Sequence, residues 1–159
     1  MENIDTIFAQ VKNEEQKLIF NRFSADDAWK LGNLMVKKAR KEHLALGIDI
    51  QLNGMQAFHY SFEGVAPYNA LWIQRKENTV DLYRHSSLYL FCEMEKGIRS
   101  FEKMVISQEE YAAFGGGFPI RIKNVGIVGS VAVSGLFHLD DHNFVVQAIA
   151  DFLGVELPA

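Results

Sequence analysis

The sequence predicts an α+β fold in which helices flank an antiparallel sheet. Residues 46–52 alternate between apolar and other side chains and lead directly into Asn53-Gly54, which is the pattern of a β-hairpin. Two further apolar segments, residues 118–122 and 125–133, predict a second hairpin. Because the strands come in adjacent pairs and do not alternate singly with helices, we expect antiparallel pairing instead of parallel βαβ units.

The beginning of the chain predicts a helix, a strand and a second helix. Apolar residues at helical spacing predict an amphipathic helix over residues 3–17, and the apolar run 18–20 predicts a first strand. Ser24 begins the pattern S-x-x-D, a variant capping box. A helix with an exposed basic face is therefore expected over residues 25–43.

The first hairpin is expected to have apolar side chains on both faces. With a two-residue turn, Ile48 faces His59, so the imidazole shares the apolar face. Phe58 and Tyr60 then join Asp49 on the other face. A sheet covered on both sides needs two layers of helix, or one layer and a subunit interface.

The middle of the chain predicts mainly helices. Pro67 suits a first helical turn, and the helix over residues 68–84 is expected to continue or restart as far as Gly97. Ser107 and Glu110 have capping-box spacing, which predicts a short helix that ends at the following glycine triplet.

The end of the chain predicts a last helix. Asp140 is expected to cap this helix, and Gly154 stands where a left-handed C-terminal cap belongs. No linker rich in proline, glycine or serine divides the chain. We therefore expect a single domain over residues 1–159.

Composition and charge exclude several classes of protein. The formal net charge of -4 argues against a nucleic-acid partner, because there is no positive excess to release phosphate counterions. Cys92 is the single cysteine, which excludes an intramolecular disulfide and an all-thiolate metal site and favours a cytoplasmic location. The apolar runs are too short to span a membrane, and the polar start MENIDTIFAQ has no signal-peptide core.

Several short motifs form a specific combination. They are N-A-L-W-I-Q-R-K at 69–76, Ser86-Ser87, G-G-G-F-P-I at 115–120, V-S-G-L at 133–136 and D-H at 141–142. Together they resemble a little-characterised bacterial and fungal family of the haem-degrading-domain group, whose relatives include GlcG, HbpS and the C-terminal domain of PduO. The resemblance spans roughly residues 20–155.

This resemblance implies a profilin-like α/β/α fold with a five-stranded antiparallel sheet. It also implies a large symmetric homo-oligomer. The relatives point toward haem or corrinoid binding, although the haem-attachment motif C-x-x-C-H is missing from this chain.

A first candidate site combines a glycine-rich turn with two cations. The turn can expose backbone N–H groups to an anion, or it can be a helix stop followed by a flexible turn. It matches neither of the common nucleotide-binding glycine motifs. The candidate ligand-binding residues are Arg75, Lys76, Gly115, Gly116, Gly117 and Phe118.

A stripe on the predicted helix over residues 68–84 supports this site. Asn69, Trp72 and Lys76 share one helical face, with Arg75 beside it. The stripe can offer a stacking surface and cations to a carboxylate such as a haem propionate, or it can form a subunit contact around Trp72.

A second candidate site lies in the run His138-Leu139-Asp140-Asp141-His142. Its imidazoles and carboxylates suit zinc or iron, so His138, Asp141 and His142 are the candidate metal ligands. The alternative is that Asp140 caps a helix, while Asp141 and His142 occupy the exposed first turn.

Two functions follow from these observations. The first is a non-catalytic oligomeric binding or assembly protein, because no complete catalytic constellation is recognisable. The second is a protein that binds or degrades haem or another tetrapyrrole. We expect a pocket where the turn 115–118 approaches residues 138–142, with Arg75 or Lys76 at its rim. Its occupant is expected to be a small carboxylate, a divalent metal or haem, and a protein partner remains an alternative.

Overall fold

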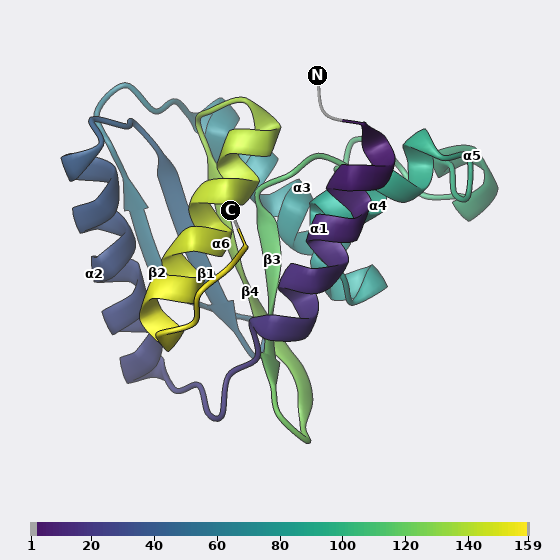
Figure 1. The fold of residues 1–159 in the computed structure, drawn as a ribbon. Coiled ribbons are helices and arrows are strands. Elements are labelled where there is room, and N and C mark those ends of the chain that lie inside the picture. Colours follow the sequence, from purple (N-terminus) through teal and green to yellow (C-terminus); the bar gives the residue numbers. More distant parts are fainter. Residues whose placement is uncertain (1–2, 159) are drawn as a thin grey trace.

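The protein is built around a four-stranded antiparallel sheet with the strand order β2-β1-β4-β3 (Figure 1). The structure, a computed structural model, describes residues 3–158, so the first two residues of the polar start lie outside it. The strands are β1 (Gly47–Leu52), β2 (Met55–Ser61), β3 (Gly117–Ile122) and β4 (Gly126–Ser134). The helices are α1 (Ile4–Lys17), α2 (Ala25–Lys41), α3 (Pro67–Tyr83), α4 (Ser87–Glu95), α5 (Phe101–Met104) and α6 (His138–Leu153).

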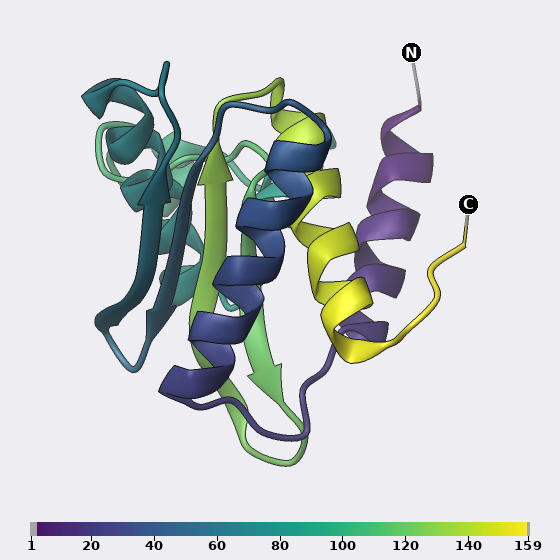
Figure 2. The ribbon, with the colours of Figure 1, turned by 90° about the vertical axis from the view of Figure 1, so that its left-hand side faces the viewer.

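Helices cover both faces of the sheet and form three layers. Helices α2 and α6 pack on one face, and α3 packs on the other, mainly against β4 and β3 (Figures 1 and 2). Helix α1 packs on α4 at the side of this sandwich. The predicted α+β class is therefore confirmed.

The expected fifth strand is reduced to one bridging residue. Phe20 forms an isolated parallel bridge to Ile122 at the edge of β3. Its N–H donates to Arg121 O at 2.8 Å, and its carbonyl accepts from Lys123 N at 2.8 Å. Only a short stretch separates α1 from the cap of α2, so the chain crosses the sheet edge after one pairing. The prediction of five strands was wrong in this respect.

The first hairpin has a register that the alternation pattern did not predict. The predicted turn is present, but β2 contains a bulge at Ala57, because Ile50 and Gln51 of β1 pair with the residues on either side of it. Phe58 and Tyr60 therefore lie on the face that packs against α2, and His59 lies beside Asp49 on the α3 face. The expected apolar surface on that face is replaced by a polar one, since one extra residue reverses the side-chain alternation.

The helices described next follow the capping signals, except near Ser107. Ser24 and Asp27 form the predicted capping box at the start of α2. Helix α3 ends in a left-handed residue, and the chain restarts as α4 with Ser86 as its N-cap. The short helix expected after Ser107 is a single turn instead, because Ala112 is drawn onto α3 by hydrogen bonds.

None of the helices within residues 3–158 has both the length and the apolarity needed to cross a membrane.

Candidate functional site

The sheet face under α3 is unusually polar for a protein interior. Helix α3 turns two ionisable side chains inward at successive positions, and the strands beneath it contribute carboxylate and hydroxyl groups. The fully or nearly buried polar residues of this layer are Asp49, Lys76, Glu77, Thr79, Ser130 and Ser134. Burial of polar groups is costly unless they are paired, so the contacts that Lys76, Glu77 and Thr79 make constrain how α3 sits on the sheet.

Lys76 forms a buried ion pair with Asp141 at the start of α6. Its Nζ lies 3.0 Å from Asp141 Oδ2 and 2.9 Å from Val133 O. The other carboxylate oxygen of Asp141 accepts a hydrogen bond from Leu136 N at 3.0 Å. Burial lowers the pKa of Lys76 and raises the pKa of Asp141, and the opposite charge of each partner counteracts the shift. The pair joins α3 to α6 across the end of β4.

The glycine triplet makes room for this ion pair. A Cβ atom at Gly116, where φ is +130°, would lie 2.6 Å from Lys76 Nζ. A Cβ atom at Gly115 would lie 2.3 Å from His138 O. The N–H of Gly117 donates to Ser87 Oγ at 2.9 Å. The turn is therefore packed closely against neighbouring backbone and side chains. It resembles a packing contact more than an open anion-binding nest.

A pair of carboxyl groups also lies under α3, and no sequence pattern predicted it. Glu77 and Asp49 are almost fully buried, and their side chains are within hydrogen-bond reach of each other. Asp49 Oδ1 accepts from Gln56 Nε2 at 2.6 Å and lies 2.9 Å from His59 Nδ1. Burial and the charge of Asp49 raise the pKa of Glu77 to about 10, so this carboxyl group is protonated at neutral pH. Sequence spacing could not reveal the pair, because its two members lie on different elements.

The three predicted metal ligands are directed to three different partners. His138 Nδ1 accepts from Gly115 N at 3.1 Å, Asp141 is paired with Lys76, and His142 Nε2 lies 2.8 Å from Glu14 Oε1. Within residues 3–158, no group of three or more histidine, cysteine, aspartate or glutamate side chains is placed to hold a metal ion.

The start of α6 also differs from the prediction. The helix begins at His138 with Phe137 as its N-cap and without a side-chain cap, so Asp140 lies in the first turn and is not the cap. Leu136, in the short connection between β4 and α6, donates its N–H to Asp141. This hydrogen bond sets the start of the helix one turn before the start that was predicted with Asp140 as the cap.

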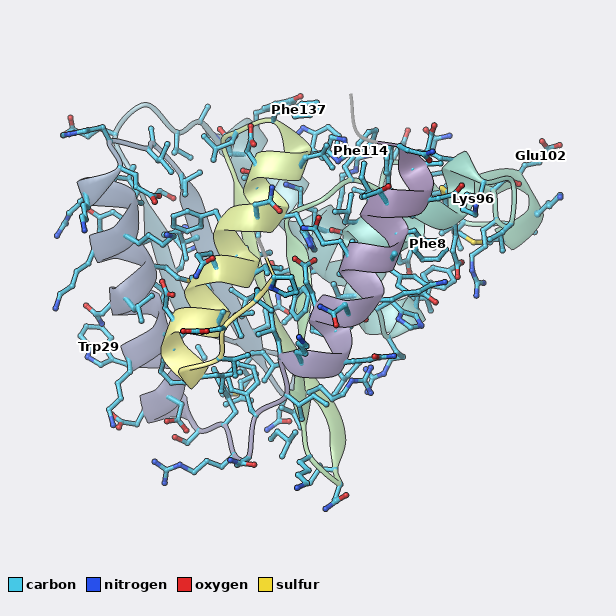
Figure 3. The ribbon with its side chains drawn as sticks, in the orientation of Figure 1. Phe8, Trp29, Lys96, Glu102, Phe114 and Phe137 are labelled. Carbon is cyan, nitrogen blue, oxygen red and sulfur yellow. The ribbon has the colours of Figure 1, made fainter. Side chains whose placement is uncertain are left out.

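An open hollow with a volume of about 410 Å³ lies above the ion pair. Phe114 and Phe137 contribute to its walls, and Figure 3 shows both side chains near the N-terminal end of α6. Its remaining lining residues are Tyr68, Asn69, Trp72, Lys76, Ser134, Gly135, Leu136, His138 and Asp141. Aromatic walls over a polar floor suit a ligand that is flat and carries polar groups at its edge.

The aromatic walls are in mutual contact. The ring centroids of Tyr68 and Trp72 are 6.2 Å apart, those of Trp72 and Phe114 are 5.6 Å apart, and the geometry is edge-to-face in each case. Phe137 stands beside the His138 ring at 4.8 Å. Neither Phe114 nor Phe137 was predicted as a site residue, although each precedes a predicted turn or helix start and is an apolar residue outside the core pattern.

His138 lines the hollow and carries a hydrogen-bond donor on its ring. Because the Gly115 N–H donates to Nδ1, that nitrogen must be unprotonated, and the neutral ring carries its proton on Nε2. Burial lowers the pKa of His138, and the nearby charge of Lys76 lowers it further. The imidazole is therefore neutral at neutral pH.

Arg75 and Phe118 lie away from this hollow. The Arg75 guanidinium stacks 4.2 Å from the Trp72 ring centre and donates to Gln108 O at 2.5 Å. It borders a neighbouring hollow of about 620 Å³ between α3 and residues 108–110. Phe118 is buried in the core on the other side of the sheet. Of the predicted ligand-binding residues, Lys76 alone lines the hollow beside His138.

A family model described as "Haem degrading protein HbpS-like" matches residues 23–150. The chain belongs to this HbpS-like family. The resemblance drawn from the sequence motifs is thereby confirmed.

Similar sequences and similar solved structures are consistent with membership of the HbpS-like family. A UPF0303 protein of Streptomyces coelicolor is 41% identical over 147 residues, which cover 92% of this chain and 93% of that protein. The protein in the crystal structure of Ybr137w has 29% sequence identity to this chain. The two structures superpose with a TM-score of 0.84 over 92% of this chain and 87% of that one. The structure named PduOC:Heme Complex shares the fold, with 16% identity and a TM-score of 0.69 over 86% of this chain and 99% of that one.

Proposed function

We propose that this member of the HbpS-like family is a non-catalytic binding protein that works as a homo-oligomer in the cytoplasm and holds a planar carboxylate ligand of the tetrapyrrole class. The observation that carries the proposal is the aromatic hollow over the buried pair of Lys76 and Asp141. The description of the family and the haem complex of a structural neighbour support the ligand class.

The residues of the hollow fit the organic part of haem better than its iron. The rings of Tyr68, Trp72, Phe114 and Phe137 offer apolar contact to a macrocycle. His138 offers an N–H group, which suits a carboxylate oxygen, and its Nδ1 lone pair is engaged by Gly115. The ring therefore has no free lone pair for a metal ion.

A titration with hemin tests the binding function. We expect saturable quenching of tryptophan fluorescence, with one ligand per chain, because Trp72 lines the hollow. Phe137→Ala removes an exposed aromatic wall and is expected to weaken binding between about twofold and tenfold. Met55→Ala is the matched control, since Met55 is equally exposed but lies at the turn of the first hairpin.

Two results would contradict the proposal. Binding that does not saturate would indicate adsorption of the porphyrin to apolar surface. An equal loss of affinity in Phe137→Ala and Met55→Ala would indicate the same.

Light scattering tests the homo-oligomer. Tyr68 and Leu71 are 64% and 66% exposed on the outer side of α3, next to the hollow that Arg75 borders. Such apolar exposure is typical of a subunit contact. We expect a mass that is a multiple of 18.0 kDa at micromolar concentration, and a smaller mass for Leu71→Asp than for the control Met55→Asp. A monomer mass for the unmodified protein would rule out this part of the proposal.

A further inference from the structure

We propose that the hollow recognises its ligand by its aromatic plane and its carboxylate groups, and that binding does not depend on a metal in the ligand. This inference rests on the proposed binding function and specifies the chemistry that the ligand must carry. It predicts that a metal-free porphyrin acid is bound as well as its iron complex.

The first step is the fixed tautomer of His138. Its Nδ1 is an acceptor for the Gly115 N–H, so Nε2 holds the proton. An imidazole that binds iron needs an unprotonated nitrogen, and it commonly donates from its other nitrogen to an acceptor. Here the second nitrogen meets a donor instead. The local hydrogen bonding is the reverse of the arrangement that supports a metal-ligating histidine.

The second step is that the backbone holds this arrangement in place. The Cβ position of Gly115 is 2.3 Å from His138 O and 3.0 Å from His142 Cβ, so the turn already lies against α6. If Nδ1 carried the proton, it would face the Gly115 N–H at 3.1 Å with two donors opposed. The tautomer with the proton on Nδ1 is therefore disfavoured, because the partly buried N–H of Gly115 would lose its acceptor.

The third step is a second source of hydrogen-bond donors on the floor. Ser134 Oγ accepts from Asn69 Nδ2 at 3.2 Å, and a hydroxyl that accepts keeps its own hydrogen to donate. The ammonium of Lys76 is 3% exposed and is held by Val133 O and Asp141, so the Ser134 hydroxyl, and not the lysine, is the donor on the floor. This hydroxyl suits an oxygen-rich edge of a ligand.

The fourth step concerns the charge of Asp141, which would repel a carboxylate if it stood alone. Lys76 neutralises it at 3.0 Å, and Leu136 N–H donates to its other oxygen. The floor is therefore electrically balanced and offers hydrogen-bond donors to the ligand. The conflict between anion binding and the acidic residues of this segment is resolved within the protein.

The test compares three ligands in a Trp29→Phe background. The chain has two tryptophans, and Trp29 lies on α2, away from Phe114 and the hollow (Figure 3), so this change leaves Trp72 as the reporter. The ligands are protoporphyrin IX, hemin and protoporphyrin IX dimethyl ester. We expect the two acids to bind within about threefold of each other and the ester to bind about tenfold more weakly, as for the loss of one hydrogen bond to a charged group.

Two variants of His138 separate recognition from folding. His138→Leu removes the donor and is expected to weaken binding of both acids about tenfold and binding of the ester much less, because the ester oxygen is a neutral acceptor. His138→Gln keeps an N–H donor and is expected to retain the preference for the acids over the ester. A purely structural role would change the affinities for acids and ester together.

Three outcomes would decide against these proposals. Hemin binding at least tenfold more tightly than protoporphyrin IX, with a Soret band of ligated iron, would overturn the independence from the metal. An ester that binds as tightly as the acids would overturn carboxylate recognition. Failure of all three ligands to bind would overturn the proposed function itself.

Discussion

Lys76→Met is expected to lower the free energy of unfolding by about 3–5 kcal/mol, because it leaves a buried carboxylate without its cation. The side chains of Lys76 and Asp141 are 3% and 2% exposed, so water cannot replace the lost contact. The Lys76 ammonium also donates to Val133 O, which loses its partner as well. Urea unfolding at pH 7, monitored by circular dichroism, measures the change.

A double variant provides the control for this prediction. Asp141→Asn removes the negative charge but keeps an oxygen that can accept from Leu136 N. The combination Lys76→Met with Asp141→Asn should therefore recover most of the stability lost in Lys76→Met alone. A loss below about 1 kcal/mol in the single variant would show that the pair behaves like a solvent-exposed ion pair.

Glu77→Gln is expected to make the protein more stable at alkaline pH. The pKa of Glu77 is raised from 4.5 to about 10, so the folded protein keeps a proton that the unfolded chain releases between these values. The folded state thus binds more protons in this range, and its stability falls as the pH rises through it, at up to about 1.4 kcal/mol per pH unit. The glutamine is neutral at every pH and still offers an N–H to Asp49.

Urea unfolding at pH 6, 7, 8 and 9 tests this expectation. The stability of Glu77→Gln should exceed that of the unmodified protein, with a difference that grows with pH. Glu63→Gln is the control, since it changes an exposed carboxylate by the same chemistry. If the curves for Glu77→Gln and the unmodified protein ran parallel, the carboxyl group would not be protonated in the folded state.

Local sequence signals predicted the elements of the fold well. The pattern S-x-x-D at Ser24 formed its capping box, and Gly154 adopted the left-handed cap conformation with φ of 69°. Both hairpins appeared where alternation and apolar runs placed them. These predictions succeed because caps and turns depend on residues a few positions apart, and such local patterns can be read directly from a sequence.

The register and the site depended on interactions that spacing does not display. The bulge at Ala57 moved Phe58 and His59 to opposite faces from those expected, and nothing in the alternation marks an unpaired residue. The glycine triplet resembled an anion-binding nest, but its lack of side chains leaves room for Lys76, which lies on α3. Residues that meet across helices and strands are invisible to local patterns.

The two inward ionisable side chains of α3 also have a geometric consequence. Apolar contacts tolerate sliding and rotation of a helix, whereas a buried ion pair or hydrogen bond is satisfied at a single position. Lys76 reaches α6 and Glu77 reaches β1, so two successive residues fix the helix in two directions. Any turn or shift of α3 along its axis would separate at least one of these pairs. The position and rotation of α3 on the sheet are therefore both fixed. The aromatic side chains that α3 carries keep a constant alignment with those at the start of α6.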